Sequence, residues 1–363
     1  MRKLASIVLI FAFLSTHTII ANAAVKPGSS CKKLGQTSAF SGKKYICVKS
    51  GKKLVWNKGI TKLSPVPIDP NDQILFTALN EIRSHKSLSK SFQVNYNIEN
   101  GVSHELVTTV TQTHINFIDS FGEYFDSKTV FNVVVSNTYN YVNSSFVSLG
   151  GTESWINSQM SFVRSAYPEN YFVSRPVWAF ATYLNNDKLK PILVYMSYPN
   201  YKYSFDSKEV GAHEMFHLVQ ESLNLGSGNL PCWIHEGQAS FVGSALAEPS
   251  ESFASTIRMI RTFGGMHSAG SDLSKIEAPQ GWNGWHGSCM DVGEYQVGRI
   301  ANAYLVGKYG WKKSLDFLKA MNGQPADGNS WKVVFENIFD QPIKEFYVDA
   351  ELFINWFFKK YVS

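Results

Sequence analysis

The sequence has no apolar run long enough to cross a membrane after its first two dozen residues, which excludes a multi-span membrane protein. It also lacks a phosphate-cradling glycine-rich loop, a nucleophile elbow and any nucleic-acid-binding motif. Charged residues are scarce at 17%, whereas hydrophobic residues reach 44% and aromatic residues 14%, so the chain can bury a core and is not largely disordered. A length of 363 residues predicts two domains, or one large domain with an appendage.

Acidic residues are missing from residues 25–62, which contain ten lysines and carry a formal charge of +10. Residues 1–24 add +2, and residues 63–363 are net acidic at −7, with 22 bases against 29 acids. The lysine-rich segment predicts a surface that binds an anionic cell-wall polymer or another acidic surface through an attraction that salt screens. A solvated hairpin without a partner is an equally good interpretation. Trp56 alone offers little stacking surface, so no nucleic-acid partner is predicted.

The N-terminus has the three parts of a secretory signal. Met1–Lys3 is positively charged, Leu4–Leu14 is apolar but too short to span a bilayer, and Ala21–Ala23 supplies the small residues that signal peptidase requires. We therefore predict a signal peptide over residues 1–24 and a secreted, extracellular protein with no transmembrane segment after cleavage. Association with the cell wall is a further option, and an uncleaved N-terminal anchor is the minority alternative.

The chain has four cysteines, which allow three pairings in an oxidising compartment. Local pairing is the favoured interpretation. It predicts a Cys31–Cys47 disulfide in the N-terminal segment and a Cys232–Cys289 disulfide in the main domain. Four free thiols in a cytosolic protein are the alternative, which the signal sequence disfavours.

Residues 25–62 are predicted to form a basic, disulfide-stapled β module. Two short strands, at 45–48 and 53–56, are joined by Ser50-Gly51, which is a hairpin signal. The pattern of cysteines, Gly-Lys-Lys steps and Trp56 resembles a short Cys/Lys-rich module found near the N-termini of exported actinobacterial proteins. A proline-rich linker follows at residues 63–70, and the main domain is predicted over residues 71–363.

The main domain is predicted to be an α+β domain. A Val/Ile-rich pattern predicts strands at 130–135, 177–184 and 192–198, and helical periodicity predicts helices at 71–84, 103–125 and 153–165. From Ser207 onward the pattern is almost wholly helical. A small sheet followed by a mostly helical C-terminal part is therefore expected.

The stretch His213–His217 has the sequence His-Glu-Met-Phe-His. Two histidines four residues apart lie on one face of a helix, so both imidazoles can reach a single metal ion. Glu214 points along an adjacent direction, where it can take a proton from metal-bound water without binding the metal. Catalytic zinc requires a third protein ligand, and Glu236 is the candidate because a second helix returning after a loop brings it level with His217.

The motif with eighteen residues between His217 and Glu236, the latter within Trp-Ile-His-Glu-Gly-Gln-Ala, resembles the gluzincin metallopeptidases. The resemblance covers about residues 190–320. It implies a zincin-like metallopeptidase domain in which His213, His217 and Glu236 bind Zn²⁺ and Glu214 is the general base. His235 replaces the asparagine that usually precedes the last ligand.

The same resemblance points to Tyr295 as a donor to the oxyanion of the tetrahedral intermediate, with packing in a helix as the alternative. No Gly-x-Met-Glu-Asn element occurs between residues 63 and 213, so action on a peptide or protein substrate as an endopeptidase is favoured over aminopeptidase action. The strands at 177–184 and 192–198 are candidates for aligning the substrate. The rival hypothesis is a non-catalytic cell-wall or surface interaction protein that retains the fold, and a zinc hydrolase acting on wall peptides or another amide is a third.

Overall fold

The computed structural model describes most of the chain. The described residues are 26–40, 43–58, 60–61, 69–87, 91–166, 177–197, 206–223, 230–247, 270–277, 289, 292–325 and 327–362. The predicted signal peptide, residues 1–24, lies outside them, as do residues 63–68 of the predicted linker. The chain divides into two compact units, residues 1–68 and 69–363, and each is described by itself.

The first unit is a small antiparallel sheet made of β1 (Thr37–Phe40), β2 (Lys43–Ser50), β3 (Lys53–Trp56) and β4 (Ile60–Thr61). Strands β2 and β3 form the predicted hairpin, and Gly51 in its turn has a φ of 62°, which glycine adopts without strain. The Cys31–Cys47 disulfide is confirmed. Tyr45, Cys47 and Trp56 form the small buried core of this unit.

The second unit contains a four-stranded sheet in the order β5 (Gln93–Ile98), β6 (Val130–Ser136), β8 (Pro191–Ser197) and β7 (Val177–Tyr183). Strands β5, β6 and β8 are parallel, whereas β7 is an antiparallel edge strand connected to β8 through the short helix η3 (Leu184–Asn186). Strands β6, β7 and β8 match the predicted ones, although Tyr198 lies outside the described residues. Strand β5 was not predicted, because its sequence is half Asn and Gln.

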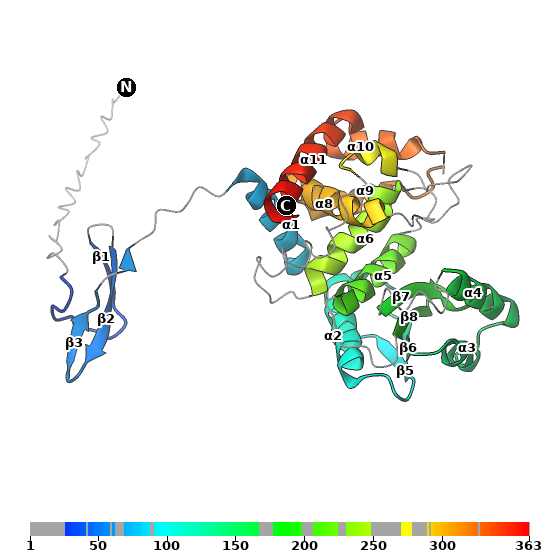
Figure 1. Ribbon diagram of the computed structural model, residues 1–363, viewed down its shortest axis with the longest axis horizontal. Coiled ribbons are helices and arrows are strands. Elements are labelled where there is room, and N and C mark those ends of the chain that lie inside the picture. Colours follow the sequence, from blue (N-terminus) through cyan, green and yellow to red (C-terminus); the bar gives the residue numbers. More distant parts are fainter. Residues whose placement is uncertain are drawn as a thin grey trace, which may run out of the picture. The chain divides into compact units, whose positions relative to one another are not determined.

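Helices cover both faces of this sheet (Figure 1). Val134 and Val194 pack with residues of α3 (Tyr139–Ser148) and α4 (Glu153–Ala166), whereas Tyr195 belongs to the larger core with α2 (His104–Phe121) and α5 (Asp206–Ser222). Successive side chains of a strand point to opposite faces of the sheet, so each buried strand contributes side chains to two separate hydrophobic cores. Helix α3 was not predicted, because polar residues break its apolar stripe.

The remaining elements of the second unit are helical. Helix α1 (Pro70–Ser84) starts with Asp69 as its N-cap, whose side chain accepts a hydrogen bond from the backbone N–H of Asn71 at 3.0 Å. The last two residues of the predicted linker therefore form the start of this helix. The others are η1 (Gly122–Tyr124), α6 (Cys232–Ala247), η5 (Leu273–Ile276), α8 (Val292–Tyr309), α9 (Trp311–Ala320), α10 (Ser330–Phe339), α11 (Ile343–Phe357) and η6 (Phe358–Val362). Mixed helices and sheets confirm the α+β class.

Helix α6 lies between α5 and α8, and its contact with α8 is unusually close (Figure 1). A Cβ atom on Gly237 would lie 2.3 Å from the carbonyl carbon of Gly298, and one on Gly298 would lie 2.7 Å from the backbone oxygen of Trp233. The side chain of Asn302 donates hydrogen bonds of 2.8 Å to the backbone oxygens of Trp233 and Gly298. The two backbones therefore touch, and no side chain fits between them.

Replacing Gly298 by alanine is expected to destabilise the protein by about 2–3 kcal/mol, because the new methyl group meets backbone atoms that cannot rotate away. Urea denaturation followed by circular dichroism measures this change. Gln296→Ala, two residues earlier on the same helix, is the matched control and is expected to unfold within about 0.5 kcal/mol of the natural chain. Equal urea midpoints for the two variants would contradict the tight crossing.

Candidate metal centre

The metal-binding candidates come from two helices that small residues bring close together. Helix α5 packs on strand β8 at Gly211, where a Cβ atom would lie 1.3 Å from the hydroxyl oxygen of Tyr195. Helix α6 packs on α5 at Gly243, where a Cβ atom would lie 2.8 Å from the backbone oxygen of Glu209. These contacts place one turn of α6 directly beside the turn of α5 that carries the two histidines. The absence of a side chain at Gly211 and Gly243 therefore allows α5 to lie close to β8 and α6 to lie close to α5.

His213, His217 and Glu236 form a group that could hold a metal ion. The Nε2 atoms of the two histidines are 3.1 Å apart, and Oε2 of Glu236 lies 3.2 Å from Nε2 of His213 and 3.4 Å from Nε2 of His217. Ligand atoms about 2.0–2.1 Å from a tetrahedral ion are separated from one another by about 3.3 Å. The three separations therefore match a single small divalent cation.

The burial of this group also fits a cation. His213 is 5% exposed and Glu236 is 7% exposed. Oε2 of Glu236 is buried and forms no hydrogen bond with any described residue, although it faces both imidazoles. Without a cation, compensation of this buried oxygen depends on the charge of a protonated His217, and a bound metal ion would take over that role.

Hydrogen bonds on the far side of each ligand orient it. Nδ1 of His217 lies 2.7 Å from Oε1 of Gln220, and Nε2 of Gln220 donates to the backbone oxygen of His235 at 3.1 Å. That second bond fixes which atom of the amide accepts, so Nδ1 of His217 donates to it, and Nε2 is the atom that presents a lone pair once His217 has lost its second proton. Nδ1 of His213 pairs with the hydroxyl of Ser240 at 3.1 Å.

His235, which replaces the expected asparagine, also contacts the ligands. Its Nδ1 lies 3.1 Å from Oε1 of Glu236, and its ring stacks on the ring of His217 with centroids 4.4 Å apart. The hydrogen bond holds one carboxylate oxygen of Glu236 and leaves the other, Oε2, directed at the two Nε2 atoms. His235 is therefore a positioning group for Glu236.

Glu214 lies beside the ligands and is not one of them. Its Oε1 is 3.9 Å from Nε2 of His213, and its carboxylate accepts a hydrogen bond from the backbone N–H of Ala181 in β7. Burial raises the pKa of Glu214 to about 8, against the opposite effect of the nearby His217. A carboxyl group with a pKa in this range, next to a cation site, is suited to moving a proton near neutral pH.

The pKa values of the two histidines differ without a bound ion. Burial lowers the pKa of His213 to about 4. Burial also acts to lower the pKa of His217, but the Glu236 carboxylate outweighs it and raises that pKa to about 9. His217 and Glu236 are therefore an ion pair at neutral pH, and His217 must lose a proton before it can bind a metal through Nε2.

Zinc binding at pH 7 to a Glu214→Gln variant, which lacks the neighbouring titratable carboxyl, is expected to release about one proton, from His217. The affinity should accordingly rise about tenfold for each pH unit from pH 5 and level off above the His217 pKa, which in this variant lies below the value of about 9 in the natural chain because Glu214 is one of the groups that raise it. Titration calorimetry in two buffers of different ionisation enthalpy counts the protons. A count near zero at pH 7 would mean that Glu236 does not hold His217 protonated.

Tyr295 lies next to the first ligand. Its ring stacks on His213 with centroids 5.6 Å apart and an interplanar angle of 21°, and its hydroxyl donates to the backbone oxygen of Cys289 at 3.3 Å. The Cys232–Cys289 disulfide is confirmed. It joins Cys289, whose backbone oxygen accepts this hydrogen bond, to Cys232, the first residue of α6. All five residues predicted from the sequence therefore come together in the structure.

The structure adds residues that the sequence reasoning missed. Ser240 is one turn beyond Glu236, and Gln220 is three residues beyond His217, so helical spacing from each ligand would have found both. The buried Glu209 pairs with the buried Arg299, and this ion pair joins α5 to α8 one turn away from His213 and Tyr295. No local signal identifies this pair, because its members are ninety residues apart.

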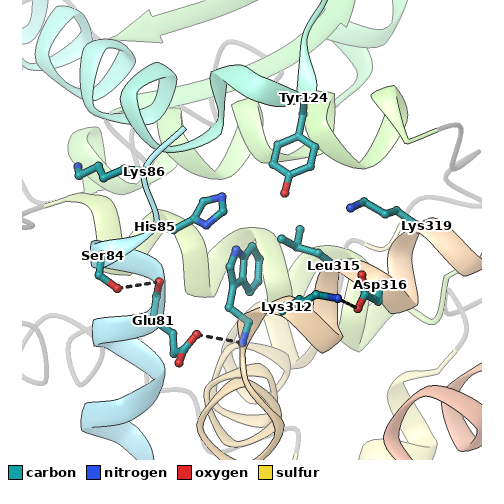
Figure 2. Close-up of a pocket in the computed structure, with 10 residues that line it drawn as sticks. Glu81, Ser84, His85, Lys86, Tyr124, Lys312, Leu315, Asp316 and Lys319 are labelled. Atoms are coloured by element: carbon teal, nitrogen blue, oxygen red, sulfur yellow. Dashed lines mark hydrogen bonds and ion pairs between the residues drawn. The ribbon is translucent and has the colours of Figure 1, made fainter. Parts of the chain in front are cut away.

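A separate cavity of about 430 Å³ lies among α1, η1 and α9. In Figure 2 the rings of His85 and Tyr124 line this cavity, and Lys86 and Lys319 lie on opposite sides of the view. None of the five predicted site residues lines this cavity. It is therefore distinct from the His/His/Glu group.

Comparisons of this chain with protein-family models, with curated proteins and with solved structures gave no match. Among the described residues, no helix is long and apolar enough to cross a membrane. The two disulfides are compatible with an extracellular protein.

Proposed function

We propose that the protein is a secreted zinc metallopeptidase of the gluzincin type. The observation that carries the proposal is the separation of the three ligand atoms, 3.1, 3.2 and 3.4 Å, with the carboxylate of Glu214 beside them. Two imidazole nitrogens and one carboxylate oxygen form a ligand set of catalytic zinc, which leaves one position for water. A purely structural zinc site does not require a second carboxylate that is not a ligand.

The ligand set favours zinc among the common divalent ions. Magnesium and calcium prefer six or more oxygen ligands, and this site offers two nitrogens and one carboxylate. A zinc ion bound here would act as a Lewis acid toward the scissile carbonyl and would lower the pKa of a water molecule. Residues His213, His217 and Glu236 would hold it.

In this proposal Glu214 accepts a proton from the attacking water and returns it to the leaving amine. Its pKa of about 8 is that of the chain without a cation, and a nearby positive charge lowers it, so Glu214 is ionised when the water must be deprotonated. Tyr295 reaches the oxyanion if its hydroxyl exchanges the backbone oxygen of Cys289 for the substrate.

The edge strand β7 is the proposed place where a peptide substrate lies. It pairs with β8 on one side, and the backbone of Ala181 reaches Glu214. An extended peptide that adds to such an edge passes next to the general base. Because the chain lacks the sequence element that binds a free α-amine in the related aminopeptidases, we propose internal cleavage of peptides or proteins.

The test uses the full chain without its signal peptide, purified with both disulfides intact. Expected results are about one equivalent of zinc by mass spectrometry of the metal, cleavage of casein, loss of cleavage with a chelator, and recovery when zinc is added back. Zinc binding without cleavage of casein or of a panel of wall peptides would favour the non-catalytic interaction protein. Absence of zinc binding at saturating concentration would reject the metal site itself.

A further inference from the structure

The lysines of the first unit gather at one end of its sheet. The backbone N–H of Cys31 donates to the oxygen of Leu54 at 3.1 Å, and Ser30 bridges Val55 in antiparallel orientation, so Lys32 follows next to Lys53. Lys49 pairs in register with Leu54 across the hairpin, next to the Ser50–Lys53 pair, so it lies at the same end of the sheet as Lys53 but on the opposite face. We call the group Lys32, Lys33, Lys49, Lys52 and Lys53 the hairpin lysine cluster.

No carboxylate balances this cluster within its own unit. All five side chains are exposed, and within the part of the chain that the structure describes no ion pair involves any of them. Residues 1–68 contain no Asp or Glu, and the first acid is Asp69. Lys32 and Lys53 are neighbours across paired strands, where like charges repel one another, and the disulfide and small core of the unit fix the strands that carry them. A polyanion would relieve the repulsion by supplying the missing negative charge.

The chemistry around the cluster narrows the kind of polyanion. Among the residues of the unit whose burial the structure describes, the aromatic ones are Tyr45 and Trp56, which are 5% and 8% exposed and so offer no platform on which bases could stack. Among the described residues of the unit, Leu34 is the exposed large hydrophobic side chain, which is too little to insert into a bilayer. The five lysines are exposed and lie at or beside the turn of the hairpin. They can therefore contact successive charges of an extended polymer better than they can surround one small anion.

We propose that the hairpin lysine cluster binds a linear polymer that bears phosphate or carboxylate groups along its length and no bases. The binding is electrostatic and tethers the second unit to that polymer. It is independent of the metal centre, because no residue of the cluster belongs to the second unit.

The experiment measures anisotropy of two fluorescently labelled probes, linear inorganic polyphosphate and polyglutamate, with the full chain at a series of salt concentrations. The test variant is Lys49→Gln with Lys52→Gln and Lys53→Gln. The matched control carries the same change at three exposed lysines of the second unit, Lys128, Lys319 and Lys344. Mass spectrometry of both variants verifies that the two disulfides have formed.

The test variant is expected to bind at least one probe about tenfold or more weakly at low salt. Its plot of log affinity against log salt should be shallower by about 2, because three lysines no longer release counterions. The control variant should stay within about twofold of the natural chain. The relative response to the two probes shows whether the polymer carries phosphate or carboxylate.

Three results would overturn the proposal. The first is equal binding by the test variant and the natural chain, and the second is an equal loss in the control variant. The third is tighter binding, by tenfold or more, of an oligothymidylate or of anionic vesicles of matched charge, which would point to nucleic acid or a membrane. If the triple variant does not form its disulfides, the pair Lys32→Gln and Lys33→Gln replaces it, with an expected slope change of about 1.4.

Discussion

Glu214→Gln is expected to lower the rate of casein cleavage by roughly 10³-fold while the variant still binds one zinc ion. The amide keeps the size of the carboxylate but cannot accept a proton from water. It also keeps all three ligands in place, because Oε1 of Glu214 lies 3.9 Å from Nε2 of His213 and Glu214 is not part of the ligand group. Turnover assays together with zinc analysis of the same sample measure the two effects separately.

The matched control for this variant is Glu221→Gln, seven residues later on the same helix and the same face. Burial raises the pKa of Glu221 as it does that of Glu214, and both carboxylates feel the charge of His217. Glu221→Gln is nevertheless expected to keep the natural rate within about threefold, since Glu221 lies about two turns beyond Glu214 along the helix. Cleavage by Glu214→Gln at the natural rate would remove Glu214 from the role of base.

Glu236→Ala is expected to weaken zinc binding by far more than the roughly 10- to 100-fold that loss of an outer hydrogen-bond partner costs, and to abolish cleavage. The variant loses one of three ligands and the charge that opposes the cation. It also removes the group that raises the pKa of His217, so this histidine becomes easier to deprotonate. Competition with a chelator of known affinity measures the zinc dissociation constant.

Ser240→Ala is the graded control, because Ser240 contacts Nδ1 of His213 and leaves all three ligands in place. Its zinc affinity is expected to fall about tenfold, with cleavage retained at saturating zinc. Equal zinc affinities for Glu236→Ala and Ser240→Ala would show that the Glu236 carboxylate does not bind the ion. The two histidines would then be the protein ligands of zinc, without Glu236.

Local periodicity predicted the elements with strong apolar patterns and missed several with weak ones, among them the strands β1, β4 and β5 and the helix α3. The Val-rich β6 and the amphipathic α2 were both expected, and the cysteine pairing followed from proximity in the sequence. Strand β5 and helix α3 are held by the cores that they border, and half-polar sequences of this kind carry little signal of their own.

The sequence alone determined the spacing of the metal-binding and proton-accepting side chains along one helix. His213 and His217 share a face because the helical period is 3.6 residues, and Glu214 falls beside them for the same reason. The family resemblance named Glu236 and Tyr295 from the sequence, but the tertiary structure decided how closely they approach this face. Their positions depend on the backbone contacts at Gly237, Gly243 and Gly298, between segments far apart in the chain, and such contacts arise from packing rather than from any local period.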